Sequence, residues 1–170
     1  MYWGDGFSET YTSTGNKTHT YSSGGTYTVT IGGTLTRFGN EGSGYNYADK
    51  LDKVTSFGDI GLTSLSGAFN GAANLTEVPA ILPATVTDLS HSFRGINASS
   101  ITNLDNWDVS SVTDMSGMFY SCNNFNQDIS GWNVSSVTNM SNMFNSCNAF
   151  NQDISAWNVS SVTDMSSMFS

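Results

Sequence analysis

Charged residues are scarce in this chain, and basic residues are the scarcest. Only 11% of the 170 residues are charged, and 14 acidic residues outnumber five Lys and Arg, for a formal net charge of -9. No basic run occurs, so the chain would repel a nucleic acid. No apolar run is long enough for a membrane-spanning helix, and the amino-terminal MYWGDG does not resemble a signal peptide.

Residues that hold metals or carry out catalysis are also few. The chain has two histidines, His19 and His91, and neither has a partner at metal-ligand spacing. Serine is abundant, but no G-x-S-x-G motif surrounds any of the serines. We therefore expect no enzyme activity, no metal and no cofactor.

A 25-residue repeat dominates the second half of the chain. WDVSSVTDMSGMFYSCNNFNQDISG (107–131) is followed by WNVSSVTNMSNMFNSCNAFNQDISA (132–156), identical at 19 of 25 positions, and a third copy runs to residue 170. Near-identity at a fixed period predicts stacked, equivalent units that act through a surface.

Alignment on phenylalanine extends the repeat towards the amino terminus. Five phenylalanines follow at spacings of 24, 26, 25 and 25 residues: Phe69, Phe93, Phe119, Phe144 and Phe169. Within one unit, Met115, Met118, Phe119 and Cys122 follow the i, i+3, i+4, i+7 pattern of a short helix. The segment from Phe125 to Ile129 alternates as a strand does. The pattern predicts five units, the last incomplete, each with a strand and a short helix.

The units resemble the BspA-like leucine-rich repeat family. The matching elements are W-D/N-V-S-S-V-T-D/N-M-S-x-M-F and F-N-Q-D-I-S, with a degenerate LTSLSGAF at 62–69. The resemblance implies a leucine-rich-repeat solenoid over 58–170 in a bacterial cell-surface or secreted protein that acts in adhesion. Related repeats occur in other microbial and viral surface proteins, and no catalytic residue is implied.

The first 40 residues resemble a different family, the polycystic kidney disease (PKD) family of immunoglobulin-like β-sandwiches. The matching pieces are WGDG at 3–6, His19-Thr20-Tyr21, and GGTYTVTI at 24–31. The expected fold class is therefore mainly β with short helices: a partial PKD-like β domain (1–40), a connector (41–57) and the solenoid (58–170).

Four columns of equivalent residues have both a structural and a functional interpretation. Cys122 and Cys147 share a slot that is apolar in earlier units, which favours buried free thiols over a disulfide. Trp107, Trp132 and Trp157 are expected in the core rather than on a sugar-binding platform. The carboxylates of two further columns are expected to be solvated or to cap turns rather than to bind calcium. One column is Asp128 and Asp153, and the other is Asp88, Asp114 and Asp164, in which Asn139 takes the place of one Asp.

These features predict a non-enzymatic adhesion module at a cell or virion surface, which binds a protein or glycan through a repetitive polar face. The candidate binding residues are Gln127, Asp128, Gln152 and Asp153. The alternative is a structural assembly subunit, of a virion or an extracellular filament, in which an uncapped end at Met168 and Phe169 packs on a neighbouring subunit. An uncapped end also favours the interpretation that the chain is a segment of a longer surface protein.

Overall fold

A computed structural model describes residues 1–40 and 46–170, so residues 41–45 of the expected connector lie outside the described residues. The chain divides into two units, Met1–Thr34 and Leu35–Ser170. The second unit therefore begins at Leu35, six residues before residue 41, where the first domain was expected to give way to the connector. The residues that lead into the repeat belong to the same unit as the repeat.

The expected fold class is wrong. In the described residues the regular elements are two short 3-10 helices, η1 (Ala48–Lys50) and η2 (Leu104–Asn106), and isolated β-bridges between single residues. Neither a β-sandwich nor a sheet-lined leucine-rich-repeat solenoid is built from these elements, and the chain is largely loop. The repeats instead form coils, each coil being one turn of chain between successive bridge residues.

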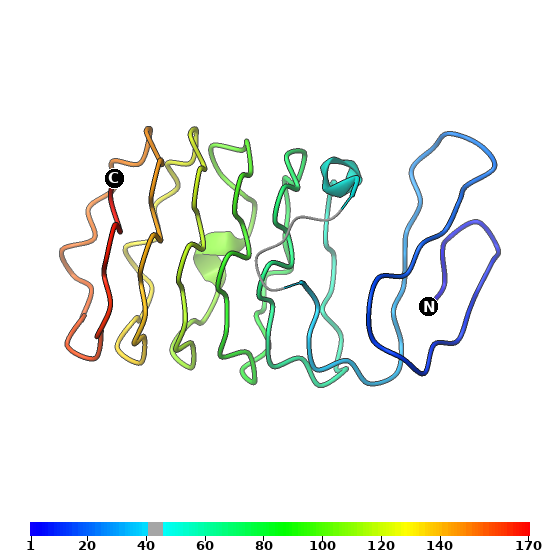
Figure 1. Cartoon of the computed structure of the whole chain (residues 1–170), viewed down its shortest axis with the longest axis horizontal. Coiled ribbons are helices and arrows are strands. Elements are labelled where there is room, and N and C mark those ends of the chain that lie inside the picture. The colour runs from blue at the N-terminus through cyan, green and yellow to red at the C-terminus, as the bar shows by residue number, and fades with distance from the viewer. Residues whose placement is uncertain (41–45) are drawn as a thin grey trace. The chain divides into compact units, whose positions relative to one another are not determined.

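Single parallel bridges connect the coils at the repeat spacing. One column of bridges links Ser64 to Asp88, Asp88 to Asp114, Asp114 to Asn139, and Asn139 to Asp164. A shorter column passes through Lys53, Glu77 and Thr102. Successive coils of the second unit therefore lie side by side, as Figure 1 shows.

Backbone hydrogen bonds explain why the coils are neither helix nor strand. The amides of Met115, Gly117, Phe119 and Ser121 donate to carbonyl groups of the next coil at 2.8–3.0 Å. The amides between them donate to carbonyl groups of their own coil; the Met118 amide, for example, donates to the Met115 carbonyl at 3.2 Å. An α-helix needs i to i−4 bonds throughout, and a ladder needs extended residues throughout, so this alternation satisfies the backbone without forming either.

Residues with left-handed backbone conformation separate these turns. The prediction of a helix from Met115 to Cys122 is therefore wrong. Gly117 and Ser121 have φ of 57° and 59°, and the equivalent Asn142 and Ser146 have φ of 57° and 58°. A left-handed residue every fourth position ends each turn before a helix can propagate. The apolar spacing of i, i+3, i+4, i+7 arises here from consecutive turns that bury the same side chains.

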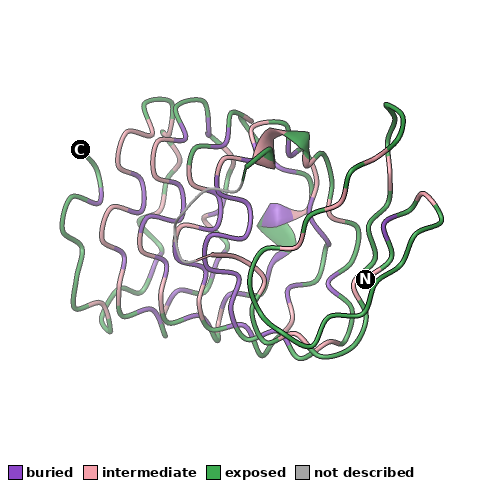
Figure 2. Cartoon of the chain, turned by 45° about the vertical axis from the view of Figure 1, so that its right-hand side comes forward, coloured by how far each residue is buried: buried purple, intermediate pink, exposed green. Residues whose placement is uncertain are grey.

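Phenylalanines of adjacent coils pack against one another at the centre of the core, and Figure 2 colours the buried residues of each coil purple. Ring centroids along this column are 5.1 Å apart for Phe69 and Phe93, 5.7 Å for Phe93 and Phe119, and 5.6 Å for Phe119 and Phe144. Rings in adjacent coils therefore pack at the spacing expected of offset aromatic stacking. Met115 and Met140 are fully buried beside them.

The first unit has little repeated structure of its own. Tyr2 forms antiparallel bridges with Ser8 and Thr30, and Val29, in the GGTYTVTI segment of the PKD-like match, is 42% exposed. The imidazole of His19 bonds the Asp5 carboxylate at 2.6 Å and stacks on Trp3, with ring centroids 5.0 Å apart. This unit is held by an aromatic cluster and single backbone pairs rather than by a sheet.

Candidate functional site

Asp and Asn side chains close a turn at three places in each repeat. In residues 107–131, Asp108, Asp114 and Asp128 accept the amide of the residue two positions later, at 3.0, 2.8 and 2.9 Å. The donor is a serine amide each time, so the local sequence is D-x-S. A short side chain that bonds the backbone two residues on is an Asx turn, which competes with helix and strand.

The following repeat forms the same turns with a different mixture of residues. Asn133, Asn139 and Asp153 accept the amides of the serines two residues later at 3.2, 3.0 and 2.9 Å. An amide oxygen accepts this bond as a carboxylate oxygen does. The exchange of Asp and Asn between repeats therefore preserves the turn while it changes the charge.

The two glutamines expected to bind a partner form hydrogen bonds between coils. The Gln127 side chain accepts the Ile101 amide at 2.8 Å and donates to the Asp105 carboxylate at 3.2 Å. The Gln152 side chain donates to the backbone and side-chain oxygens of Asn126, at 3.0 and 2.9 Å. These polar groups are used within the fold, and their contact with a partner stays a prediction.

Asp128 and Asp153 remain exposed and occupy the same position in adjacent repeats. A hydrogen bond from the Ser130 backbone lowers the pKa of Asp128, and one from Ser155 lowers the pKa of Asp153. The Asp153 carboxylate opposes the shift at Asp128, since like charges repel. Both groups are therefore ionised at neutral pH, and each carboxylate accepts the serine amide of its own turn.

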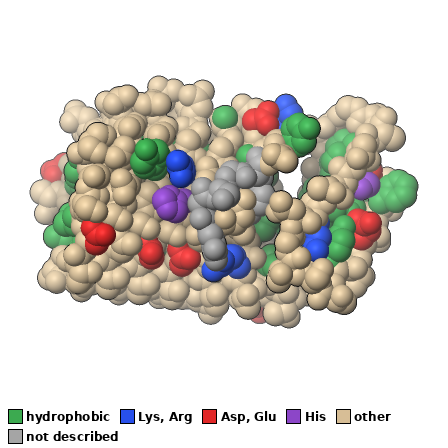
Figure 3. Space-filling view, in the orientation of Figure 1, with side chains coloured by type: hydrophobic (Ala, Val, Ile, Leu, Met, Phe, Trp, Pro, Cys, Tyr) green, Lys and Arg blue, Asp and Glu red, His purple; other side chains and the backbone are tan. Residues whose placement is uncertain are grey.

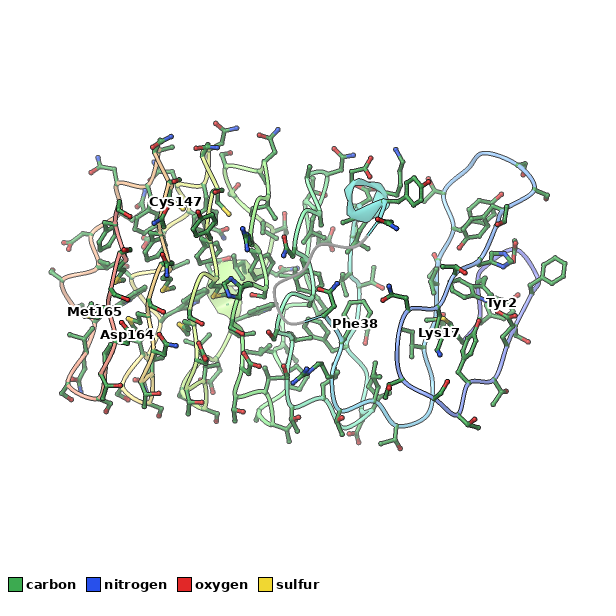
Figure 4. The ribbon with its side chains drawn as sticks, in the orientation of Figure 1. Tyr2, Lys17, Phe38, Cys147, Asp164 and Met165 are labelled. Carbon is green, nitrogen blue, oxygen red and sulfur yellow. The ribbon has the colours of Figure 1, made fainter. Side chains whose placement is uncertain are left out.

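The other acidic column closes turns along the main line of bridges. Asp88 accepts hydrogen bonds from Ser64 at 2.8 Å and from the Ser90 amide at 3.0 Å. Asp164, labelled in Figure 4, accepts the Ser166 amide at 2.9 Å. These carboxylates cap turns, as the capping alternative expected. Across the described ranges, no group of three or more His, Cys, Asp or Glu could hold a metal ion.

The tryptophan column lies in the core, as expected. Trp107, Trp132 and Trp157 are 2%, 4% and 7% exposed. The Trp107 indole donates to the Pro79 carbonyl at 2.8 Å, and the Trp157 indole donates to that of Ile129 at 3.3 Å. With their faces covered, these rings do not form a platform for a sugar.

The two residues of the expected assembly end differ in exposure. Met168 is 4% exposed, while Phe169 is 58% exposed and stacks on Phe144 with ring centroids 5.5 Å apart. Met165 in the same coil, labelled in Figure 4, is 44% exposed, although the equivalent Met140 is fully buried. Apolar side chains are therefore exposed on the last coil, whereas the equivalent side chains of the earlier coils are buried.

Sequence reasoning missed a cluster around His91, which stands where other coils have Gly, Asn or Ser. His91 has a left-handed φ of 54°, and its buried Nδ1 has no hydrogen-bond partner among the residues that the structure describes. Burial and the nearby Arg94 lower the pKa of His91. The Arg94 guanidinium lies over the Tyr120 ring, 4.6 Å from its centroid. The signal available in the sequence was the departure of His91 and Tyr120 from the repeat.

A shallow cavity of about 420 Å³ lies outside the near-identical repeats. It is lined mainly by Phe57, Pro79, Ile81 and Pro83, with Thr55 and Ser56 as polar neighbours. Ile81 is 80% exposed at this cavity. None of the described lining residues has a titratable side chain, so the lining offers a ligand no ionisable group.

Residues 85–170, half of the chain, match the protein family described as Mycoplasma protein of unknown function, DUF285. The chain belongs to this family. The DUF285 match begins just before the Asp88 bridge and covers the coils that carry the Asx turns and the candidate carboxylates. No curated protein and no solved structure matches the chain. No helix in the described part of this DUF285 protein is long and apolar enough to cross a membrane.

Proposed function

We propose that the chain is a non-enzymatic binding module at a cell or virion surface, whose coils present repeated carboxylates to a protein partner. The observation that carries the proposal is the pair of Asp128 and Asp153, equivalent, exposed and held in the same turn geometry on adjacent repeats. Repetition makes individually weak contacts additive, because the second contact forms at high effective concentration.

The charge of the chain favours a basic partner. The net charge is -9, and the visible surface in Figure 3 is mostly uncharged polar groups and backbone, with scattered acidic side chains. Lys and Arg on a partner would be attracted to these carboxylates, and salt would weaken that attraction. A glycan is the less favoured ligand, because the tryptophans that could stack on sugar rings are buried.

The test is binding of the full chain to immobilised extracellular-matrix proteins and glycans, at several salt concentrations. The decisive variant is Asp128→Asn/Asp153→Asn, which removes two charges and retains the turns, as Asn133 does naturally. We expect this variant to lose most of its binding to a basic protein. The matched control is Asp108→Asn/Asp114→Asn, which removes the same charge where the next repeat carries Asn.

Equal binding by both double variants would contradict the proposed site, and the absence of any salt-sensitive protein ligand would contradict the proposed function. Binding to glycans alone, unaffected by salt, would also count against a basic protein partner.

A second candidate function is assembly of copies into a larger structure. The observation that favours it is the apolar surface of the last coil, where Met165 and Phe169 are exposed although equivalent residues are buried. Analytical ultracentrifugation of the chain and of Phe169→Ser separates the two functions. Concentration-dependent assembly that Phe169→Ser abolishes supports this candidate, and monomers at all concentrations exclude it.

A further inference from the structure

We propose that Cys122 and Cys147 form a disulfide between adjacent coils when the protein meets a small-molecule disulfide oxidant. Both cysteines carry free thiols in the structure. The bridge would connect residues 25 positions apart and join two coils that are already in register. This modification is independent of the proposed binding function.

Backbone and side-chain bonds hold the two cysteine segments together on both sides. Before the cysteines, the Ser121 amide donates to the Asn145 carbonyl at 2.8 Å. After them, the Ala149 amide donates to the Asn123 carbonyl at 3.1 Å, and the side chains of Asn148 and Asn123 are bonded at 2.9 Å. Chains paired in this way lie about 4.8 Å apart, within the Cα separation of about 4.4–6.8 Å that a disulfide requires.

The two thiols point in the same direction along the stack. Cys122 Sγ donates to the Phe93 carbonyl at 3.0 Å, and Cys147 Sγ donates to the Phe119 carbonyl at 2.7 Å. Phe119 belongs to the same coil as Cys122, three residues before it. The sulfur of Cys147, the residue labelled in Figure 4, therefore points toward the coil that contains Cys122.

The surroundings of the two thiols give them different roles in the reaction. Cys147 is half-buried and Cys122 is fully buried, so the oxidant meets Cys147 first. The neighbouring Cys122 side chain lowers the pKa of Cys147, and burial raises the pKa of Cys122. A thiolate is the attacking species in thiol–disulfide exchange, so Cys147 is the first nucleophile.

The reaction balances with oxidised glutathione as the oxidant. The Cys147 thiolate attacks one sulfur of the reagent, which forms a mixed disulfide and releases one glutathione thiolate. The Cys122 sulfur then attacks the Cys147 sulfur, loses its proton to solvent and displaces the second glutathione thiolate. Two electrons pass from the two cysteines to the reagent. Attack by Cys122 is the slower step, because burial disfavours its thiolate.

The test incubates the full chain with oxidised glutathione and follows intact mass and free thiol content over time. We expect a transient mixed disulfide, then loss of both thiols with the mass of two hydrogen atoms removed and no added glutathione. Cys122→Ala should stop at the mixed disulfide on Cys147, and Cys147→Ala should leave Cys122 unreactive until denaturant is added. Alanine fills the equivalent slot at Ala72, which is 1% exposed.

A stable glutathione adduct in the wild-type chain would overturn the proposal, as would disulfide-linked dimers. Two thiols that stay reduced in the folded chain, but react once it is unfolded, would overturn it as well. The wild-type measurement decides the question even if one alanine variant fails to fold.

Discussion

Substitution of Gly117 by alanine tests whether steric fit at His91 or the left-handed backbone controls the stability of this coil. A Cβ at Gly117 would lie 2.3 Å from His91 Nδ1 and 2.5 Å from His91 Cε1. Gly95 provides the control, since its φ is also left-handed, at 69°, and an added Cβ there meets nothing within 4 Å. The two variants share the backbone cost and differ in the clash.

The magnitudes follow from these two contributions. A left-handed conformation costs a residue with a Cβ about 1–2 kcal/mol, so Gly95→Ala should lower the free energy of unfolding by about 1 kcal/mol once the less flexible unfolded chain is included. Overpacking adds about 1–3 kcal/mol, so Gly117→Ala should lower it by about 2–4 kcal/mol.

Urea denaturation monitored by tryptophan fluorescence measures both free energies of unfolding. A double-mutant cycle with His91→Ala then isolates the contact, and we expect it to recover about 1–3 kcal/mol of the loss caused by Gly117→Ala. Equal losses in the two glycine variants, or no coupling to His91, would refute the steric argument. Backbone conformation alone would then account for the glycine.

Three further predictions concern the turns, the core and the carboxylates. Asp114→Ala should lower the free energy of unfolding, measured by urea denaturation, by about 0.5–2 kcal/mol. Asp114→Asn should lower it little, because an amide also caps the turn. Equal losses in the two variants would contradict the Asx-turn interpretation. Phe119→Ala should cost about 3–5 kcal/mol in the same assay, and Phe169→Ala, with a 58% exposed ring, should cost far less; a similar loss in both would contradict the stacked core. The pKa values of Asp128 and Asp153 are lowered in the folded chain, so their contribution to stability is present above the pKa of an unfolded Asp and is lost as pH falls through the folded value. The melting temperature should therefore fall below about pH 4, less steeply in Asp128→Asn/Asp153→Asn, and identical profiles would contradict the shifts.

The phenylalanine alignment predicted the core well because burial depends on which residues recur, whatever backbone carries them. Cys122, Met115 and Met140 are fully buried, as their columns indicated. The same alignment did not predict Met165, which is 44% exposed, because its coil has no covering neighbour in the structure.

The prediction of secondary structure failed for a different reason, because two backbone conformations bury side chains at the same sequence spacing. A helix from Met115 to Cys122 and a series of four-residue turns both place apolar side chains at i, i+3, i+4 and i+7. The deciding residues were Gly117 and Ser121, whose left-handed φ a single sequence signals only weakly when the residue is serine. The D-x-S and N-x-S motifs were also present in the sequence, and their recurrence three times per repeat favours loops over regular elements.

The candidate site shows how repetition limits where specificity can reside. Polar groups that recur in each coil are mostly engaged in the fold, as the bonds of Gln127 and Gln152 demonstrate. The first two near-identical repeats differ at six positions, and at two of these Asp and Asn exchange within the same turn. Among the others, Gly117 and Tyr120 contact His91 and Arg94 of the preceding coil. Repeated carboxylates can give a partner affinity through number, but only a non-repeating cluster of this kind can fix which coil the partner contacts.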